Sequence, residues 1–140
     1  RPSMLDDLGL TATLRWLCKE FESLHQNIAL DRKLDVDEER LTDIQVDMIF
    51  RIIQEALNNI SKHSRAESAS IWLTSGQKRL ILEIKDDGVG FDWKAGLDGK
   101  GFGLSSMRER ARISDGFFSI ESREGEGTLL RVVWPQPGDA

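Results

Sequence analysis

The stretch RIIQEALNNISKH, residues 51–63, is the part of the sequence that says most about the fold. At about 100° per residue, its apolar residues fall on one side of a helix. This stripe consists of Ile49, Ile52, Ile53, Ala56, Leu57 and Ile60. The pattern predicts a long amphipathic helix over residues 43–63. Four polar side chains project away from the centre of the stripe and a histidine lies at its border: Glu55, Asn58, Asn59, Lys62 and His63.

A glycine-rich turn, DDGVG at residues 86–90, follows a predicted strand over residues 79–86. Asp86 shares the phase of the apolar residues of that strand, so we expect its carboxylate to point toward the core. A buried carboxylate is costly unless it meets a donor, and the exocyclic amine of adenine is one such donor. Gly88 and Gly90 would permit a ligand to approach the backbone closely. The alternative is a tight turn whose aspartate caps neighbouring amides.

A second glycine cluster, GKGFGL at residues 99–104, stands directly before a predicted helix over residues 104–114. Exposed amides and the helix dipole attract phosphate at such a position. The cluster is not a P-loop, because Lys100 is followed by Gly101 instead of Ser or Thr. It is not a Rossmann fingerprint either, because Leu104 stands where the last glycine would fall. The alternative is a flexible loop with a helix cap.

Glu55 and Asn59 lie four residues apart on the predicted helix. A carboxylate and an amide oxygen are hard ligands that can hold Mg²⁺ directly or through water. Lys62, a further turn along, would supply a point charge for phosphate. The alternative is a solvated helix face with paired charges, and a histidine such as His63 is commonly only a helix-end or core residue.

The remaining segments complete a fold of three helices and five strands. The other predicted ranges are a helix at 11–25 that follows a break at Gly9, and strands at 27–34, 69–74, 117–122 and 128–134. Gly116 is expected to end the last helix at its C′ position. The last two strands are adjacent in sequence and therefore antiparallel. These elements predict an α/β two-layer sandwich, with helices on one face of a mixed sheet.

Composition narrows the classes of function. The chain has 140 residues, enough for one domain, and a net charge of −5, which argues against a nucleic-acid partner. Cys18 is the single cysteine, so an internal disulfide and a multi-cysteine zinc site are excluded. His25 and His63 are the only histidines, so a histidine-rich metal centre is excluded as well. No apolar run approaches the ~20 residues of a membrane span, so we expect no membrane contact by this segment.

Together, in this order, the three clusters resemble the ATP-binding catalytic domain of sensor histidine kinases. That domain has the Bergerat-type ATP-binding fold of the GHKL superfamily, which includes gyrase, Hsp90 and the mismatch-repair ATPase. Residues 51–63 match its N box, residues 86–90 its G1 box and residues 99–104 its G2 box. Residues 103–111 look like the subfamily paired with LuxR-type response regulators. The resemblance extends over residues 1–135.

The resemblance implies a role for each matching position. Asn59 would bind Mg²⁺, Asp86 would read the adenine, and Glu55 would orient a metal-bound water or act as a base. Residues 91–100 would form a short lid over ATP. The full set implied to bind ATP is Asn58, Asn59, Lys62, His63, Asp86, Gly88, Gly90, Lys100, Gly101, Phe102, Gly103, Leu104 and Thr128.

The resemblance also divides the chain and implies an activity. Residues 1–10 look like the end of a dimerisation and phosphoacceptor helix, residues 11–135 like the catalytic domain, and residues 136–140 like a frayed tail. The implied enzyme is a protein histidine kinase of a two-component system. It would bind Mg-ATP and present the γ-phosphate to a histidine on an upstream domain absent from this chain, for relay to a response regulator aspartate. The domain would be cytoplasmic, within a protein that is cytoplasmic or anchored in the inner membrane.

Two alternatives remain open from the sequence. One is an ATP-sensing or scaffold module without transfer activity. The other is a serine kinase of the anti-sigma-factor type, which shares the three boxes. The run LDDLGL at residues 5–10 counts against the second, because that type has no phosphoacceptor helices.

Overall fold

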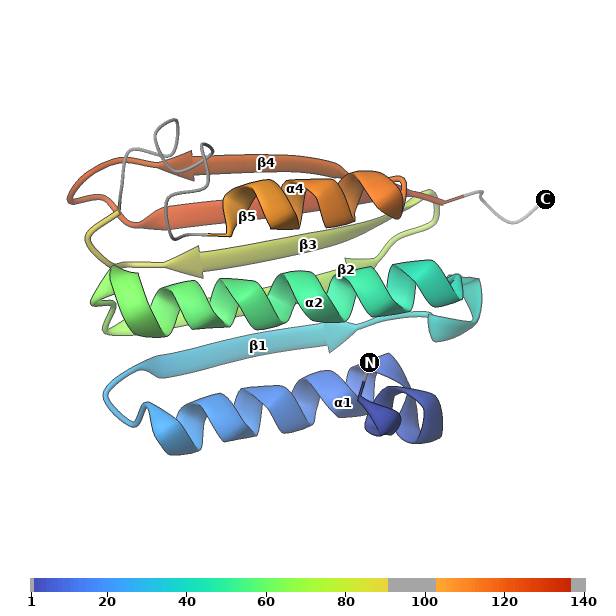
Figure 1. Ribbon diagram of the computed structural model, residues 1–140, viewed down its shortest axis with the longest axis horizontal. Coiled ribbons are helices and arrows are strands. Elements are labelled where there is room, and N and C mark those ends of the chain that lie inside the picture. Colours follow the sequence, from blue (N-terminus) through green and yellow to red (C-terminus); the bar gives the residue numbers. More distant parts are fainter. Residues whose placement is uncertain (1, 91–102, 137–140) are drawn as a thin grey trace.

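The computed structural model describes residues 2–90 and 103–136. Within this part, three helices cover one face of a five-stranded sheet (Figure 1), as the sequence predicts. The elements in chain order are α1 (Ser3–Leu24), β1 (Ala29–Asp35), the 3₁₀ turn η1 (Glu38–Arg40), α2 (Asp43–Asn59), the π turn η2 (Ile60–Ser64), β2 (Ser68–Ser75), β3 (Arg79–Asp86), α4 (Leu104–Ile113), β4 (Phe117–Ser122) and β5 (Thr128–Pro135).

The sheet is mixed, with the strand order β1-β2-β3-β5-β4. β1 and β2 are parallel because the segment containing α2 crosses from the end of one strand to the start of the other. The remaining pairs, β2 with β3, β3 with β5 and β4 with β5, are antiparallel. The five strands agree with the predicted ranges to within two residues at either end.

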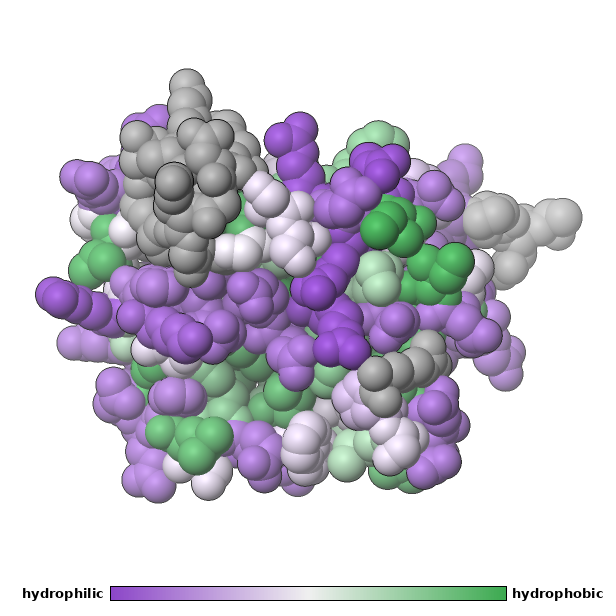
Figure 2. All heavy atoms as spheres, viewed as in Figure 1, coloured by the Kyte–Doolittle hydropathy of each residue, from purple (hydrophilic) through white to green (hydrophobic). Residues whose placement is uncertain are grey.

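The core lies between the sheet and the helices. Alternate residues of the central strands face the helices, and Trp134 on β5 is fully buried. Its indole N–H donates to the Ser114 hydroxyl at 2.9 Å, which satisfies the buried donor. The outer surface of the helical layer is mainly hydrophilic (Figure 2). No helix among the described residues is both long and apolar enough to cross a bilayer.

Helix α1 begins at Ser3 and not near residue 11 as predicted, and it bends at Gly9, where φ is +85°. The Leu10 N–H donates to Glu38 Oε1 at 2.6 Å, so a carboxylate from η1 caps the second part of the helix. Leu5, on the first part, is only 3% exposed and belongs to the core. The predicted break at Gly9 is therefore a kink inside one longer element.

Helix α2 starts with a capping box, in which Thr42 and Gln45 exchange side-chain-to-backbone hydrogen bonds. Its end differs from the prediction, because residues after Asn59 form the π turn η2. The Ser64 hydroxyl donates to the Ile60 carbonyl at 2.7 Å and accepts from the Ala66 N–H at 3.0 Å. Single π turns inside helical segments are frequent at functional sites.

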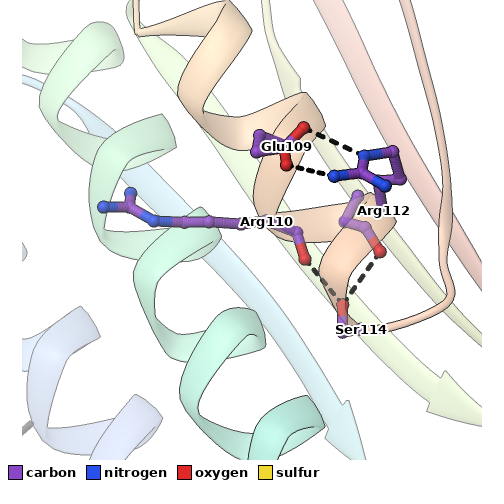
Figure 3. Close-up of polar contacts among 5 residues, drawn as sticks. Glu109, Arg110, Arg112 and Ser114 are labelled. Atoms are coloured by element: carbon purple, nitrogen blue, oxygen red, sulfur yellow. Dashed lines mark hydrogen bonds and ion pairs between the residues drawn. The ribbon is translucent and has the colours of Figure 1, made fainter.

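The end of α4 also differs from the prediction. Asp115, not Gly116, occupies the left-handed C′ position, with φ of +63°. The Gly116 N–H donates to the Ala111 carbonyl and the Asp115 N–H to the Arg112 carbonyl, which is a Schellman motif. The Ser114 hydroxyl donates to the carbonyls of Arg110 and Ala111, next to a Glu109–Arg112 ion pair on the exposed side (Figure 3). Both Asp115 and Gly116 can adopt a positive φ, so the sequence alone did not show which of them takes the C′ position.

Candidate functional site

A cavity lies between the helical layer and the sheet, where η2, α4 and the ends of three strands meet. It encloses about 470 Å³ of atom-free space, part of it open to solvent. Its walls are mostly apolar with a few polar groups, the composition typical of small-molecule sites. It is lined by Ala56, Asn59, Ile60, His63, Ser64, Ile84, Asp86, Gly90, Leu104, Met107, Ile120, Thr128 and Leu130.

The cavity brings together residues from each separate cluster of the sequence. Six of the predicted site residues line it: Asn59, His63, Asp86, Gly90, Leu104 and Thr128. They come from the α2–η2 junction, the turn after β3, the start of α4 and the start of β5. The fold therefore brings residues that are up to 69 positions apart in the chain to the wall of one partly open cavity.

Other predicted residues lie outside this cavity. Glu55 and Asn58 line a shallow groove between α1 and α2. The Glu55 carboxylate also packs against the start of α4, where a Cβ on Gly103 would overlap it. Lys62 is exposed and Gly88 is buried, and neither lines the cavity. Lys100, Gly101, Phe102 and the expected lid at 91–100 lie outside the described residues.

Asp86 is the acidic residue of the cavity. It is half-buried at the end of β3, opposite Ala69 on β2 and Thr128 on β5. Its Oδ1 accepts a hydrogen bond from the Gly88 N–H at 2.9 Å. Burial raises the pKa of Asp86 above its ordinary value, with a smaller contribution from the negative charge of Asp87, and the Gly88 N–H opposes the shift. The carboxylate is thus partly desolvated and can accept a further donor from a ligand.

The turn after Asp86 is fixed by main-chain contacts on both sides. A Cβ on Gly88 would overlap the Ser64 carbonyl, and one on Gly90, where φ is +66°, would overlap the Arg123 carbonyl. The Val89 N–H donates to the Ser64 carbonyl at 2.6 Å, and the Val89 carbonyl accepts from the Gly125 N–H. These glycines are required by the packing of the protein itself, a role that the sequence did not indicate.

Ser122, which holds the predicted residue Thr128, and several apolar lining residues were missed as site residues in the sequence. The Ser122 and Thr128 hydroxyls share a hydrogen bond of 2.7 Å, which orients Thr128 at the rim. The side chains of Met107, Ile120 and Leu130 form apolar walls. Their alternation in strands or helical spacing signals only burial, so nothing in the sequence separates a cavity wall from ordinary core.

The described residues of the cavity would hold a metal together with a ligand. Among residues 2–90 and 103–136, no group of three or more His, Cys, Asp or Glu side chains is arranged to hold an ion. Asn59 contributes an amide to the cavity wall, and the Glu55 carboxylate is one helical turn away. Mg²⁺ is commonly bound by one or two protein oxygens together with substrate phosphates and water, so this donor set fits that mode.

Comparisons with known proteins identify the family of this chain and its relatives. The family model described as "Histidine kinase-, DNA gyrase B-, and HSP90-like ATPase" matches residues 44–138. The chain is 38% identical over 136 residues to the signal transduction histidine-protein kinase/phosphatase UhpB of Salmonella typhimurium, covering 97% of this chain and 26% of that protein. It is 33% identical over 135 residues to the oxygen sensor histidine kinase NreB of Staphylococcus carnosus, covering 96% of this chain and 39% of that protein. The chain therefore spans well under half the length of these curated relatives.

Solved structures share the fold at low sequence identity. The Erythrobacter litoralis EL346 blue-light activated histidine kinase matches with a TM-score of 0.72 at 18% identity, over 90% of this chain and 41% of that chain. The mycobacterial sensor histidine kinase MprB matches with a TM-score of 0.68 at 15% identity, over 92% of this chain and 95% of that chain. The matching family model, which extends over more than half of the sequence, shows that this chain belongs to the family of histidine kinase-, DNA gyrase B-, and HSP90-like ATPases.

Proposed function

We propose that this chain is the ATP-binding catalytic domain of a sensor histidine kinase and that ATP occupies the cavity beside Asp86. The observation that carries the proposal is that Asp86 and Asn59, 27 residues apart in the sequence, line one cavity. Membership of the ATPase family and the likeness to histidine kinases over nearly the whole chain support it.

The cavity walls suit the parts of ATP. The Asp86 carboxylate would accept a hydrogen bond from the exocyclic amine of adenine, and the adenine ring would lie among Met107, Ile120 and Leu130. The phosphates would extend toward Asn59, His63 and the first turn of α4, whose N-terminal N–H groups and dipole favour an anion. The positions implied for Lys62, Lys100, Gly101, Phe102 and Gly103 remain predictions.

Mg²⁺ would join this site through Asn59, with Glu55 acting on a metal-bound water. When bound, the ion neutralises charge on the phosphate oxygens during transfer. The residues of this chain would orient the triphosphate and exclude water from it. Phosphoryl transfer needs mainly such positioning and charge stabilisation, because its transition state is loose.

The acceptor of the γ-phosphate would be a histidine on an upstream domain, with relay to the aspartate of a response regulator that carries a LuxR-type output. Residues 1–10 would be the end of the helix that leads from that domain. The relatives are named as histidine kinases, and this chain corresponds to only part of each. The work of such a domain on ATP favours a cytoplasmic location.

Titration with a fluorescent ATP analogue, with and without Mg²⁺, tests the nucleotide site. We expect saturable binding that Mg²⁺ strengthens and that Asp86→Ala weakens by at least about tenfold, the effect of losing a hydrogen bond to a charged group. Asp35→Ala is the matched control, because Asp35 is an exposed aspartate on β1 outside the cavity. Equal affinity of the parent and Asp86→Ala would contradict the assignment.

A further inference from the structure

Asp87 lies next to Asp86 but outside the cavity, and its side chain is exposed. Its carboxylate nevertheless accepts three hydrogen bonds from the residues that open β2. Oδ1 accepts from the Glu67 N–H at 2.9 Å and from the Ser68 N–H at 3.0 Å, and Oδ2 accepts from the Ser68 hydroxyl at 2.8 Å. The Asp87 N–H also donates to the Ser68 carbonyl at 3.2 Å. These bonds lower the pKa of Asp87, as expected for an ionised carboxylate with several donors.

The residues held by Asp87 continue directly from the opposite wall of the cavity. Asn59, His63 and Ser64 line that wall, and the chain then passes through Arg65, in the left-handed conformation, to Glu67 and Ser68. A second hydrogen bond follows two residues after Asp87, where the Val89 N–H donates to the Ser64 carbonyl at 2.6 Å. The turn after Asp86 is therefore attached to residues 64–68 on both sides of Gly88.

We propose that Asp87 is a positioning residue for the nucleotide site, an inference that rests on the proposed function. It holds the turn after β3 against residues 64–68, and so keeps the Asp86 carboxylate at a fixed place relative to Asn59 and His63. Hydrogen-bond geometry carries this effect, since charge at an exposed side chain is screened by solvent. An asparagine at this position preserves the arrangement, because its Oδ1 accepts from both backbone N–H groups and its Nδ2 donates to the Ser68 hydroxyl.

Three substitutions of Asp87 separate geometry from charge. Asp87→Asn keeps the bonds without the charge, Asp87→Glu keeps the charge but displaces the acceptor oxygens, and Asp87→Ala removes both. Affinity for the fluorescent ATP analogue and the preference for ATP over GTP in competition are measured at a temperature where circular dichroism shows each variant folded. A residue that only stabilised the fold would leave both quantities unchanged in folded molecules.

We expect Asp87→Asn to bind within about twofold of the parent. Asp87→Ala binds about tenfold more weakly and with a smaller preference for ATP, and Asp87→Glu lies between them. Parental affinity and preference in Asp87→Ala overturn the inference, as does equal weakening in Asp87→Asn and Asp87→Ala. Should Asp87→Ala fail to fold, parental binding by Asp87→Glu overturns it instead. Absence of ATP binding by the parent removes the proposed function and this inference together, whereas the other outcomes remove the inference alone.

Discussion

At the scale of single residues, the surroundings of two adjacent carboxylates shift their pKa values in opposite directions. Burial raises the pKa of Asp86, while hydrogen bonds from Ser68 and Glu67 lower that of Asp87. In the folded chain without ligand, Asp86 thus contributes stability that is fully present below its unfolded pKa and is lost as the pH rises through its folded value. Asp87 contributes stability that is present above its unfolded pKa and is lost as the pH falls through its folded value.

Nucleotide binding should depend on the ionised form of Asp86, because only the carboxylate offers all its oxygens as acceptors to the adenine amine. We expect affinity to fall as the pH is lowered through the raised pKa of Asp86, which lies above the usual 3.8. The measurement is the affinity for the ATP analogue over a pH series that descends from neutral pH toward the ordinary range of a carboxyl pKa. Asp86→Asn is the control, because it cannot titrate and reports any effect of the nucleotide's own ionisation. The same pH profile in parent and variant would refute the role of Asp86.

At the scale of elements, the sequence predicted which segments are helices and strands but not how they join. Ile60 continues the apolar stripe, so periodicity extended α2 to residue 63, whereas the chain forms a π turn from Ile60. That turn accompanies a contact between Ser64 and Val89, 25 residues apart, which no local pattern records. The Glu55 carboxylate packs against Gly103 at the start of α4, a contact that its spacing on the helix does not record, and its role at a metal site remains a prediction. These contacts join residues far apart in the sequence, so the local spacing of residues could not predict them.

The kink in α1 supplies a test at the scale of elements. Glu38 Oε1 accepts from the Leu10 N–H at the start of the second part of the helix. Glu38→Ala leaves that N–H without its acceptor, and we expect a loss of about 1 kcal/mol in the free energy of unfolding, as for other N-terminal caps. Urea denaturation measures the change, and Glu38→Gln, which retains an oxygen acceptor, should lose less. Equal stability of parent and Glu38→Ala would show that the cap contributes nothing.

At the scale of the whole molecule, one core joins all the described helices and strands. It extends from Leu5 on α1 to Trp134 on β5 and passes beneath the candidate site. The architecture and the buried face of α2 were predictable, because hydrophobic periods report which side of each element is covered. The participation of Leu5 was not, because the break at Gly9 placed the start of the first helix near residue 11.

Substitutions of two leucines in the first part of α1 test whether it belongs to this core. Leu5 is 3% exposed and Leu8 is 62% exposed. Leu5→Ala should lower the free energy of unfolding by about 2–5 kcal/mol through lost burial and a residual cavity. Leu8→Ala should change it by less than about 0.5 kcal/mol, as for most surface positions. Similar urea midpoints for the two variants would mean that residues 3–8 do not pack on the domain in solution.

The strand order β1-β2-β3-β5-β4 has a consequence for how the protein is made. β5 is the last of the described strands in chain order, yet it lies inside the sheet and is the only described strand that pairs with β4. While residues 128–135 are still within the ribosome, β3 is an unpaired edge strand and β4 has no strand to pair with. Thr128 at the cavity rim arrives with the same late segment. Both the sheet and the cavity can therefore be completed only after β5 has left the ribosome.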